Sequence, residues 1–149
     1  MTKIFTMKLY EIQPSQLFIS SEKLAQVMKT LDPTKPESFE PIPVKKLGNQ
    51  VIFVVGHTRA FAAFLHGLSE VKVYWEEDEL DWDAYEICVK WCIDEGIYTI
   101  ANLKDRVVSS KEYEVLWLKR CEKMQQDLEA KQNQRTLKQN IKGAKIHES

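Results

Sequence analysis

The stretch VIFVVGHTRAFAAFLHG, residues 51–67, decides the fold of this chain. Its first five residues form a continuous apolar run, which predicts a strand buried on both faces. Gly56 follows directly, and apolar residues at helical spacing then continue to Gly67, a residue type that commonly ends helices. The stretch therefore predicts a buried strand that enters a helix through a single glycine.

The turn at residues 56–59, with the sequence Gly-His-Thr-Arg, gathers groups that bind anions. A glycine lets the backbone approach a ligand closely, and the free N–H groups of a first helical turn favour negative charge. Arg59 offers a planar fork that matches phosphate or carboxylate, and Thr58 can donate a hydroxyl bond. His57 can bond a phosphoryl group or move a proton near neutral pH. The same spacing also fits a plain turn that leaves Arg59 on the surface.

Further segments extend this unit into a small sheet. Residues 7–12 alternate between apolar and polar side chains, which predicts a half-buried strand. Residues 41–44, Pro-Ile-Pro-Val, predict an extended segment whose prolines suit a sheet edge or a strand start, and residues 71–75 predict another strand. Ser20 or Ser21 can cap a helix that runs to the next prolines. The predicted fold class is α+β, a small mixed sheet with helices.

The chain after residue 76 has a helical pattern. Three helices are expected there, and their N-terminal caps are Asp81, Thr99 and Ser109. The second of these helices is short and ends at Val107. The third carries a long apolar stripe, which consists of Tyr113, Leu116, Trp117, Cys121, Met124 and Leu128.

We expect the chain to divide into three parts. Residues 1–76 form a phosphate-binding domain, and residues 77–134 form a helical extension that packs on it. Residues 135–149 form a polar, disordered tail. This tail carries the basic residues Arg135, Lys138, Lys142 and Lys145.

Composition limits the classes of function. The 149 residues carry a net charge of −1, so the chain has no global basic field for nucleic acid. No apolar run approaches the length of a membrane span, and the first residues are too polar for a signal peptide. The three cysteines are an odd number without framework spacing, which predicts reduced thiols and a cytoplasmic protein. Cys88 and Cys92 share a helix face, but a zinc site needs four ligands, so we expect core cysteines and no metal site.

The element order and two short boxes resemble the ParB/sulfiredoxin superfamily over residues 7–76. The residues Pro-Ile-Pro-Val at 41–44 resemble its first box, and Gly56-x-x-Arg59 resembles its second, phosphate-binding box. In this superfamily, ParB members carry Gly-Glu-Arg-Arg at the turn and bind CTP. Sulfiredoxins carry Gly-Cys-His-Arg there, and free-serine kinases carry Asp-Gly-His-His-Arg.

The turn in this chain is most similar to that of the free-serine kinases. Val55 replaces the aspartate of the kinase pattern, and Thr58 replaces its second histidine. His57 stands at the position of the sulfiredoxin cysteine, so sulfiredoxin chemistry is not expected. Gly56 and Arg59, with the start of the helix, are the features that agree with the superfamily pattern.

The resemblance implies a protein that binds a nucleotide or another small phosphorylated ligand, with phosphotransfer as a further step. Gly56, Thr58 and Arg59 would then hold the phosphates, and His57 would act as a catalytic group. Mg²⁺ would accompany the nucleotide, which would be ATP, ADP or CTP. Whether any reaction is catalysed is left open by the sequence.

A catalytic reading also needs a general base. Glu22, at the start of the first predicted helix, occupies roughly the place of the catalytic glutamate in the kinases that this chain resembles. Glu37 and Glu40 lie in the loop before the second strand and could also reach the turn. From the residues alone, each of them is better explained as a capping or solvated carboxylate.

Two non-enzymatic functions are alternatives. The protein could be a DNA-associated ParB-like module whose basic tail contacts the phosphate backbone. It could also be an interaction protein or a homo-oligomer, because the apolar stripe of residues 113–128 is long enough to form a docking face.

Overall fold

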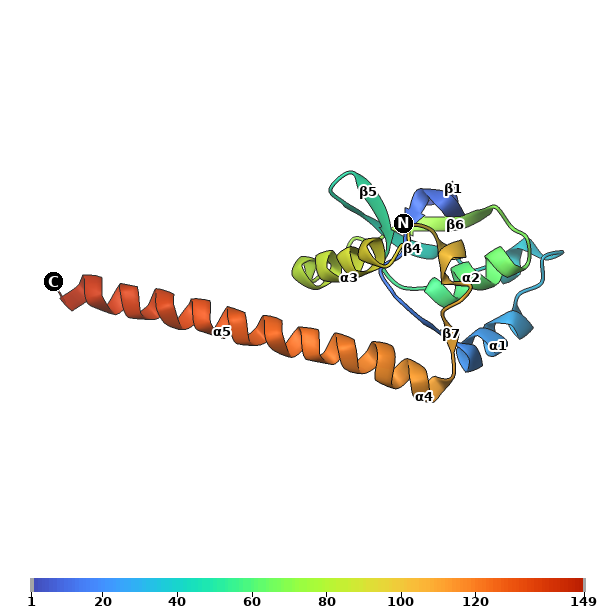
Figure 1. Cartoon of the computed structure of the whole chain (residues 1–149). Helices are drawn as coiled ribbons and strands as arrows, with labels where there is room; N and C mark the ends of the chain where they lie inside the picture. Colours follow the sequence, from blue (N-terminus) through green and yellow to red (C-terminus); the bar gives the residue numbers. More distant parts are fainter. Residues whose placement is uncertain (1, 149) are drawn as a thin grey trace.

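The computed structural model describes residues 2–148, and the side chains of residues 2–140. It contains a five-stranded sheet in the order β1-β6-β4-β5-β2 (Figure 1). β1 pairs antiparallel with β6 and β4 with β5, whereas β4 pairs parallel with β6 and β2 with β5. The predicted α+β class with a small mixed sheet is confirmed. In sheet order, the strands are Ile4–Lys8, Glu70–Trp75, Ile42–Leu47, Gln50–Phe53 and Ile12–Gln13.

The first predicted strand is in fact two strands. We expected one strand over residues 7–12, but β1 ends at Lys8 and one 3-10 turn, η1 (Leu9–Glu11), separates it from β2. The two strands lie at opposite edges of the sheet, β1 beside β6 and β2 beside β5. An alternating pattern shows which face of a strand is buried, but it does not show which strand is its neighbour. The pattern therefore did not predict that the chain leaves one edge of the sheet at η1 and joins the other.

The strand that begins with the proline segment lies at the centre of the sheet. β4 pairs with β6 on one side and β5 on the other, so the predicted edge position is wrong. The predicted strand start is confirmed, because Pro43 is the second residue of β4. Pro43 has no N–H to donate, but its carbonyl accepts a bond from the Val54 N–H at 3.2 Å.

The strand, glycine and helix predicted at residues 51–67 are confirmed. β5 ends at Phe53, which is fully buried, whereas Val55 is 53% exposed, so the buried strand is shorter than expected. α2 (His57–Leu65) starts directly after Gly56. Gly67 follows the end of α2 with a φ of +83°, a left-handed conformation that suits glycine.

Two further helices begin at their predicted caps. Ser20 accepts a bond from the Lys23 N–H at 3.4 Å at the start of α1 (Ser21–Thr30). Asp81 accepts one from the Ala84 N–H at 3.2 Å at the start of α3 (Trp82–Asp94). Both caps could be predicted from the sequence because a cap is a local contact between residues three apart.

The helix expected from Thr99 to Val107 is shorter than predicted. Thr99 caps a 3-10 segment, η3 (Ile100–Leu103), in a capping box with Asn102. Val107–Val108 form β7, which pairs parallel with β3 (Ile19–Ser20) in a separate two-stranded sheet. Pairing with a strand far away in the sequence overrides the local helical pattern here.

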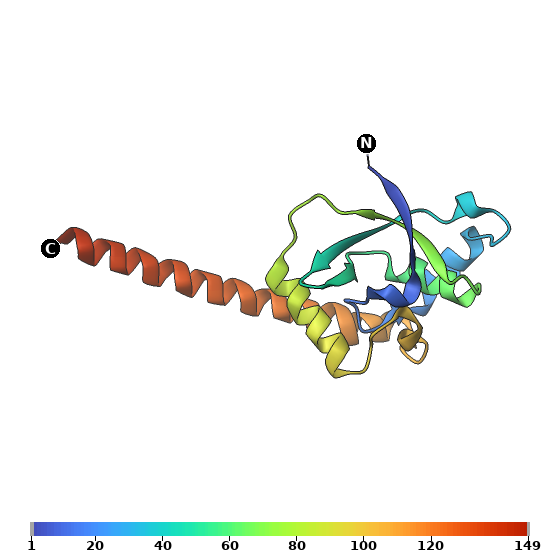
Figure 2. The ribbon, with the colours of Figure 1, turned by 90° about the horizontal axis from the view of Figure 1, so that it is seen from above.

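The C-terminal part is one nearly continuous helix. α4 (Ser110–Tyr113) leads into a π-helical segment, η4 (Glu114–Leu118), and then into α5 (Lys119–Glu148). The chain was expected to become disordered at residue 135, but α5 continues through that position and projects from the body of the protein (Figures 1 and 2). The structure does not describe the side chains of the tail residues Lys142 and Lys145.

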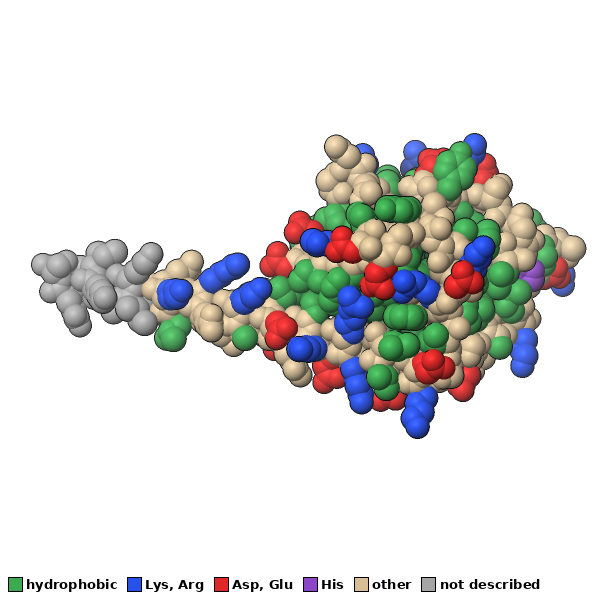
Figure 3. All heavy atoms as spheres, viewed as in Figure 1, with side chains coloured by type: hydrophobic (Ala, Val, Ile, Leu, Met, Phe, Trp, Pro, Cys, Tyr) green, Lys and Arg blue, Asp and Glu red, His purple; other side chains and the backbone are tan. Residues whose placement is uncertain are grey.

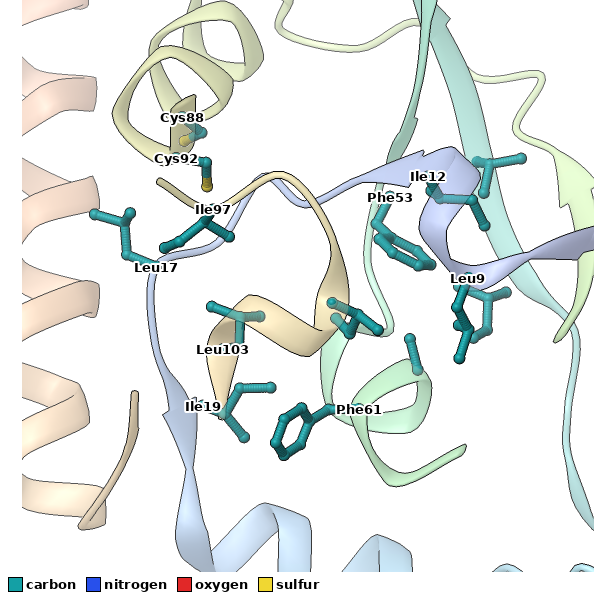
Figure 4. Packing of buried hydrophobic residues seen from close by; sticks show 14 of the residues in the cluster. Leu9, Ile12, Leu17, Ile19, Phe53, Phe61, Cys88, Cys92, Ile97 and Leu103 are labelled. Carbon is teal, nitrogen blue, oxygen red and sulfur yellow. The ribbon is translucent and has the colours of Figure 1, made fainter. Parts of the chain in front are cut away.

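One hydrophobic core joins the sheet to the later helices. Phe53 and Phe61 are almost fully buried, and they belong to the same cluster as Cys92, Ile97 and Leu103 (Figure 4). The core therefore contains residues from both sides of position 76, although a domain boundary at that position stays a prediction.

Candidate functional site

Gly56 occupies a position where a side chain does not fit. Its φ is +85°, in the left-handed region that only glycine adopts readily. A Cβ atom at this residue would stand 2.9 Å from Ile42 Cγ2 and 3.1 Å from Arg59 Nη2. The backbone of the turn therefore lies close to both the start of β4 and the Arg59 guanidinium.

The guanidinium of Arg59 is held beside the start of α2. Its Nη1 donates to the Pro41 carbonyl oxygen at 3.3 Å and lies 3.6 Å from Glu40 Oε2. The side chain of Arg59 is 29% exposed, and that of Glu40 is 80% exposed. Within the part of the chain that the structure describes, Nε and Nη2 have no such partners, so they remain for another acceptor.

The first turn of α2 has free backbone donors. The first bond within the helix runs from the Ala60 N–H to the Gly56 carbonyl at 3.0 Å, so the three preceding N–H groups have no acceptor inside the helix. Among the described side chains, none caps this helix. Thr58, in the same turn, is half-buried. Gly56, Thr58 and Arg59 thus lie together, as the sequence predicts.

His57 is not at the surface of this turn. It is 3% exposed, its ring centroid lies 5.4 Å from that of Phe53, and its Nε2 accepts the Ser15 N–H at 2.9 Å. Burial lowers the pKa of His57 to about 3, so the ring is neutral and carries its proton on Nδ1. This placement argues against the predicted catalytic role: the imidazole fixes the turn to the segment after β2.

Ser15 and Tyr85 complete this support, and sequence analysis missed both. The Ser15 hydroxyl donates to the Phe53 carbonyl at 2.8 Å, and the Tyr85 hydroxyl donates to the Val54 carbonyl at 3.1 Å. These three hydrogen bonds fix Phe53 and Val54, which precede Gly56, and His57, the first residue of α2. Neither residue carries a sequence signal, because both partners are distant in the chain.

Glu22 lies in a different part of the molecule. It is exposed in the first turn of α1 and lines a hollow of about 600 Å³ between α1 and the C-terminal helix. None of the residues that line this hollow belongs to the turn, and among the described residues no hydrogen bond or ion pair joins Glu22 to residues 56–59. The other lining residues include Lys23, Gln26, Tyr113, Glu114, Lys119 and Glu122. Of the other loop carboxylates, Glu40 reaches the turn, as proposed from the sequence.

A small cavity lies behind the turn. It has a volume of about 200 Å³ and is lined by residues of the turn, α3 and the C-terminal helix. Its lining includes Ser15, His57, Tyr85, Cys88, Trp117 and Cys121. The two cysteines in this lining come from different helices.

The apolar stripe of the C-terminal helix is largely used inside the molecule. Tyr113, Trp117 and Met124 are buried in the common core, and Cys121 and Leu128 pack against it. Leu116 is 41% exposed. The stripe therefore does not form the free docking face that a helix-mediated partner or homo-oligomer would need, and such association stays a prediction.

DNA binding stays a prediction. Basic and acidic side chains are mixed over the face shown in Figure 3. Arg135 and Lys138 are exposed on α5. Among the side chains of residues 2–140, no cluster of three or more metal-binding groups occurs. No helix in the described part of the chain is long and apolar enough to cross a membrane.

Comparison with known proteins leaves the family open. No family model matches the chain, and no curated protein matches it. Protein Atu1540 from Agrobacterium tumefaciens is 12% identical, with a TM-score of 0.45, over 65% of this chain and 50% of that one. The C-terminally truncated chromosome-partitioning protein ParB from Caulobacter crescentus, complexed with CTP-gamma-S, is 18% identical, with a TM-score of 0.42, over 62% and 53%.

These two similarities concern part of the fold. The chain spans about half the length of each of the two proteins. Membership of the ParB/sulfiredoxin superfamily therefore stays a prediction, and the function has to be argued from the site of this chain.

Proposed function

We propose that this protein binds the phosphate groups of a nucleotide or another small phosphorylated ligand at residues 56–59. One observation carries the proposal: the Arg59 guanidinium lies directly over Gly56, beside the uncapped start of α2. A phosphate at this point would meet backbone N–H groups, the positive end of the helix dipole and a planar guanidinium together. Thr58 adds a hydroxyl donor in the same turn.

The proposal concerns binding in the first place. His57 supports it as a positioning residue, because its ring fixes the turn from behind and stays neutral. Phosphotransfer would need a general base near the ligand, and Glu22 lies elsewhere. Glu40 is the carboxylate that contacts Arg59. If phosphate is transferred, we expect Glu40 and not Glu22 to assist, and to bind Mg²⁺ together with the phosphates of ATP, ADP or CTP.

Replacing Arg59 with alanine tests the site. We expect Arg59→Ala to weaken ligand binding by about 10- to 100-fold, because a hydrogen bond to a charged group contributes about 1.5–3 kcal/mol. The measurement is thermal unfolding with ATP, ADP, CTP, GTP, pyrophosphate or phosphate, with and without Mg²⁺. A ligand at about 100 times its Kd should stabilise the wild type by about 2.7 kcal/mol.

Arg135→Ala is the matched control. It removes the same charge from the exposed surface of α5, away from the turn, and should bind as the wild type does. Equal stabilisation of the Arg59 variant and the wild type by the same ligand would contradict the proposal. So would a wild type that none of these ligands stabilises.

In the absence of Mg²⁺, replacing Glu40 with glutamine should strengthen binding. Glu40 and a bound phosphate would both be negative next to Arg59, so the carboxylate competes with the ligand. Because Glu40 is mostly exposed, the gain is small, up to about 5-fold in Kd. Isothermal titration with the ligand found above measures it.

Glu37→Gln provides the comparison for that measurement. Glu37 lies in the same loop, in η2 (Pro36–Ser38), and is exposed. It should leave the affinity unchanged. An equal gain in both variants would show a general effect of net charge and not a contact at Arg59.

A further inference from the structure

Cys88 and Cys121 form a pair across the cavity behind the turn. Cys88 lies on α3 and Cys121 on α5, and both side chains line the same 200 Å³ cavity. α3 and α5 pack against each other, and each of the two thiols shifts the pKa of the other as a near neighbour would. Two thiols that face one cavity from two helices in contact are candidates for a disulfide, which needs Cα atoms within about 7 Å of each other.

The two thiols differ in reactivity. Cys121 is partly exposed, whereas Cys88 is 8% exposed. A hydrogen bond from Cys88 lowers the pKa of Cys121, and Arg120 acts in the same direction. The same hydrogen bond, together with burial, raises the pKa of Cys88. A thiolate is the reactive form of cysteine, so Cys121 is the thiol that an oxidant would meet first.

We propose that Cys121 and Cys88 are a reactive and a resolving cysteine, which close to a disulfide between α5 and α3 when a hydroperoxide oxidises the protein. In the first step, the Cys121 thiolate attacks one peroxide oxygen, the O–O bond breaks, and an alcohol or water leaves. Cys121 becomes a sulfenic acid. In the second step, Cys88 attacks this sulfur, the S–O bond breaks, and water leaves. Two thiols and one hydroperoxide thus give one disulfide, one alcohol and one water.

Cys92 serves as an internal control. It lies one helical turn beyond Cys88 on α3 and is fully buried in the core (Figure 4). Its thiol lies 3.6 Å from the Gln16 carbonyl oxygen, and burial raises its pKa to about 12. The proposal therefore assigns the disulfide to one of the three possible cysteine pairs, and Cys92 should stay reduced.

The test uses the full chain, reduced and then treated with hydrogen peroxide at neutral pH. Intact mass and thiol titration in denaturant are measured, and a non-reducing peptide map locates the bond. The wild type should lose about 2 Da, the two hydrogens of the thiols, and two of its three free thiols. Cys92→Ala should lose the same mass. Cys121→Ser should form no disulfide and should react at least about tenfold more slowly.

Cys88→Ser separates the two steps of the proposed reaction. Cys121 should still react in this variant, but without a resolving thiol it should keep the oxygen and be trapped by dimedone as a sulfenic acid. Circular dichroism of each variant confirms that it is folded. Three results would each overturn the proposal. They are a disulfide that includes Cys92, a disulfide between two copies of the chain, and a wild type that gains the mass of oxygen atoms without forming a disulfide.

Discussion

Below pH 6.5, the protein should lose stability at a rate that approaches 1.4 kcal/mol per pH unit because of His57 alone. Burial lowers the pKa of His57 from 6.5 to about 3 in the folded state. Between these values the unfolded chain binds a proton that the folded chain excludes. The stabilising contribution of the neutral ring is therefore complete above pH 6.5 and is lost as the pH falls toward 3. Protonation of His57 at Nε2 would break the hydrogen bond that this atom accepts from the Ser15 N–H.

Urea unfolding from pH 7.5 to 4.5 measures this loss, with His57→Gln as the comparison. Glutamine has no titratable group in this range, and its carbonyl oxygen can accept the Ser15 N–H. Carboxylates that titrate in this range do so in both proteins, so the difference between the two curves isolates His57. We expect the variant to be less stable at pH 7.5 but to have a shallower pH slope. Parallel curves would show that His57 is not buried in its neutral form.

Replacing Gly56 with alanine should destabilise the protein by about 2–5 kcal/mol. The left-handed backbone costs an alanine about 1–2 kcal/mol, and crowding against Ile42 Cγ2 at 2.9 Å adds about 1–3 kcal/mol. The same Cβ would also stand 3.1 Å from Arg59 Nη2, so this substitution should displace the guanidinium and weaken ligand binding. The free energy of unfolding in urea and the ligand Kd are the two measurements.

Gly48→Ala provides the matched control. Gly48 has a φ of +61°, but a Cβ there has open space within 4 Å among the described residues. The control should show the backbone cost alone, about 1–2 kcal/mol. A double variant, Gly56→Ala with Ile42→Leu, lacks the Cγ2 branch at nearly unchanged side-chain volume and should recover part of the excess loss. If Gly56→Ala and Gly48→Ala lower the free energy of unfolding equally, the close approach of Ile42 does not constrain the turn.

The parts of the fold that the sequence predicted are those that depend on near neighbours. Ser20 and Asp81 cap helices through contacts three residues away, and Gly56 follows a strand whose apolar run is continuous. The association of Thr58 and Arg59 with Gly56 follows from the start of a helix alone. Such features repeat the same local geometry in every protein, so residue type and spacing are sufficient to find them.

The errors concern contacts between distant residues. His57 has the residue type of an acid–base catalyst, but its role is set by Ser15, which lies 42 positions away. The pairing of β7 with β3 likewise replaced the end of a predicted helix with a strand. A pattern along the chain contains no information on which distant group will occupy a donor or cover a face. The position of Glu22 at the hollow beside the C-terminal helix likewise depends on distant contacts, and its catalytic role stays a prediction.

The tail was misjudged for a different reason. From residue 131 to residue 140, α5 is exposed on all sides, so no apolar stripe marks it. Its sequence is rich in glutamine, lysine and arginine, which are good helix formers. Intrinsic propensity and continuity with a packed helix explain this stretch, whereas the prediction relied on periodicity.

The π-helical segment η4 sets the rotational phase of the helix that follows it. A π-helical turn contains more residues than an α-helical turn, so a chain one residue shorter within 114–118 could wind there as α-helix and keep the later residues in phase. If the present five residues wound as α-helix instead, every later residue would rotate by about 100° around the helix axis, since an α-helix has 3.6 residues per turn. Met124 would then leave the core, and the Cys121 sulfur would turn away from Cys88. The winding of this one segment therefore decides which face of the whole C-terminal helix meets the rest of the protein.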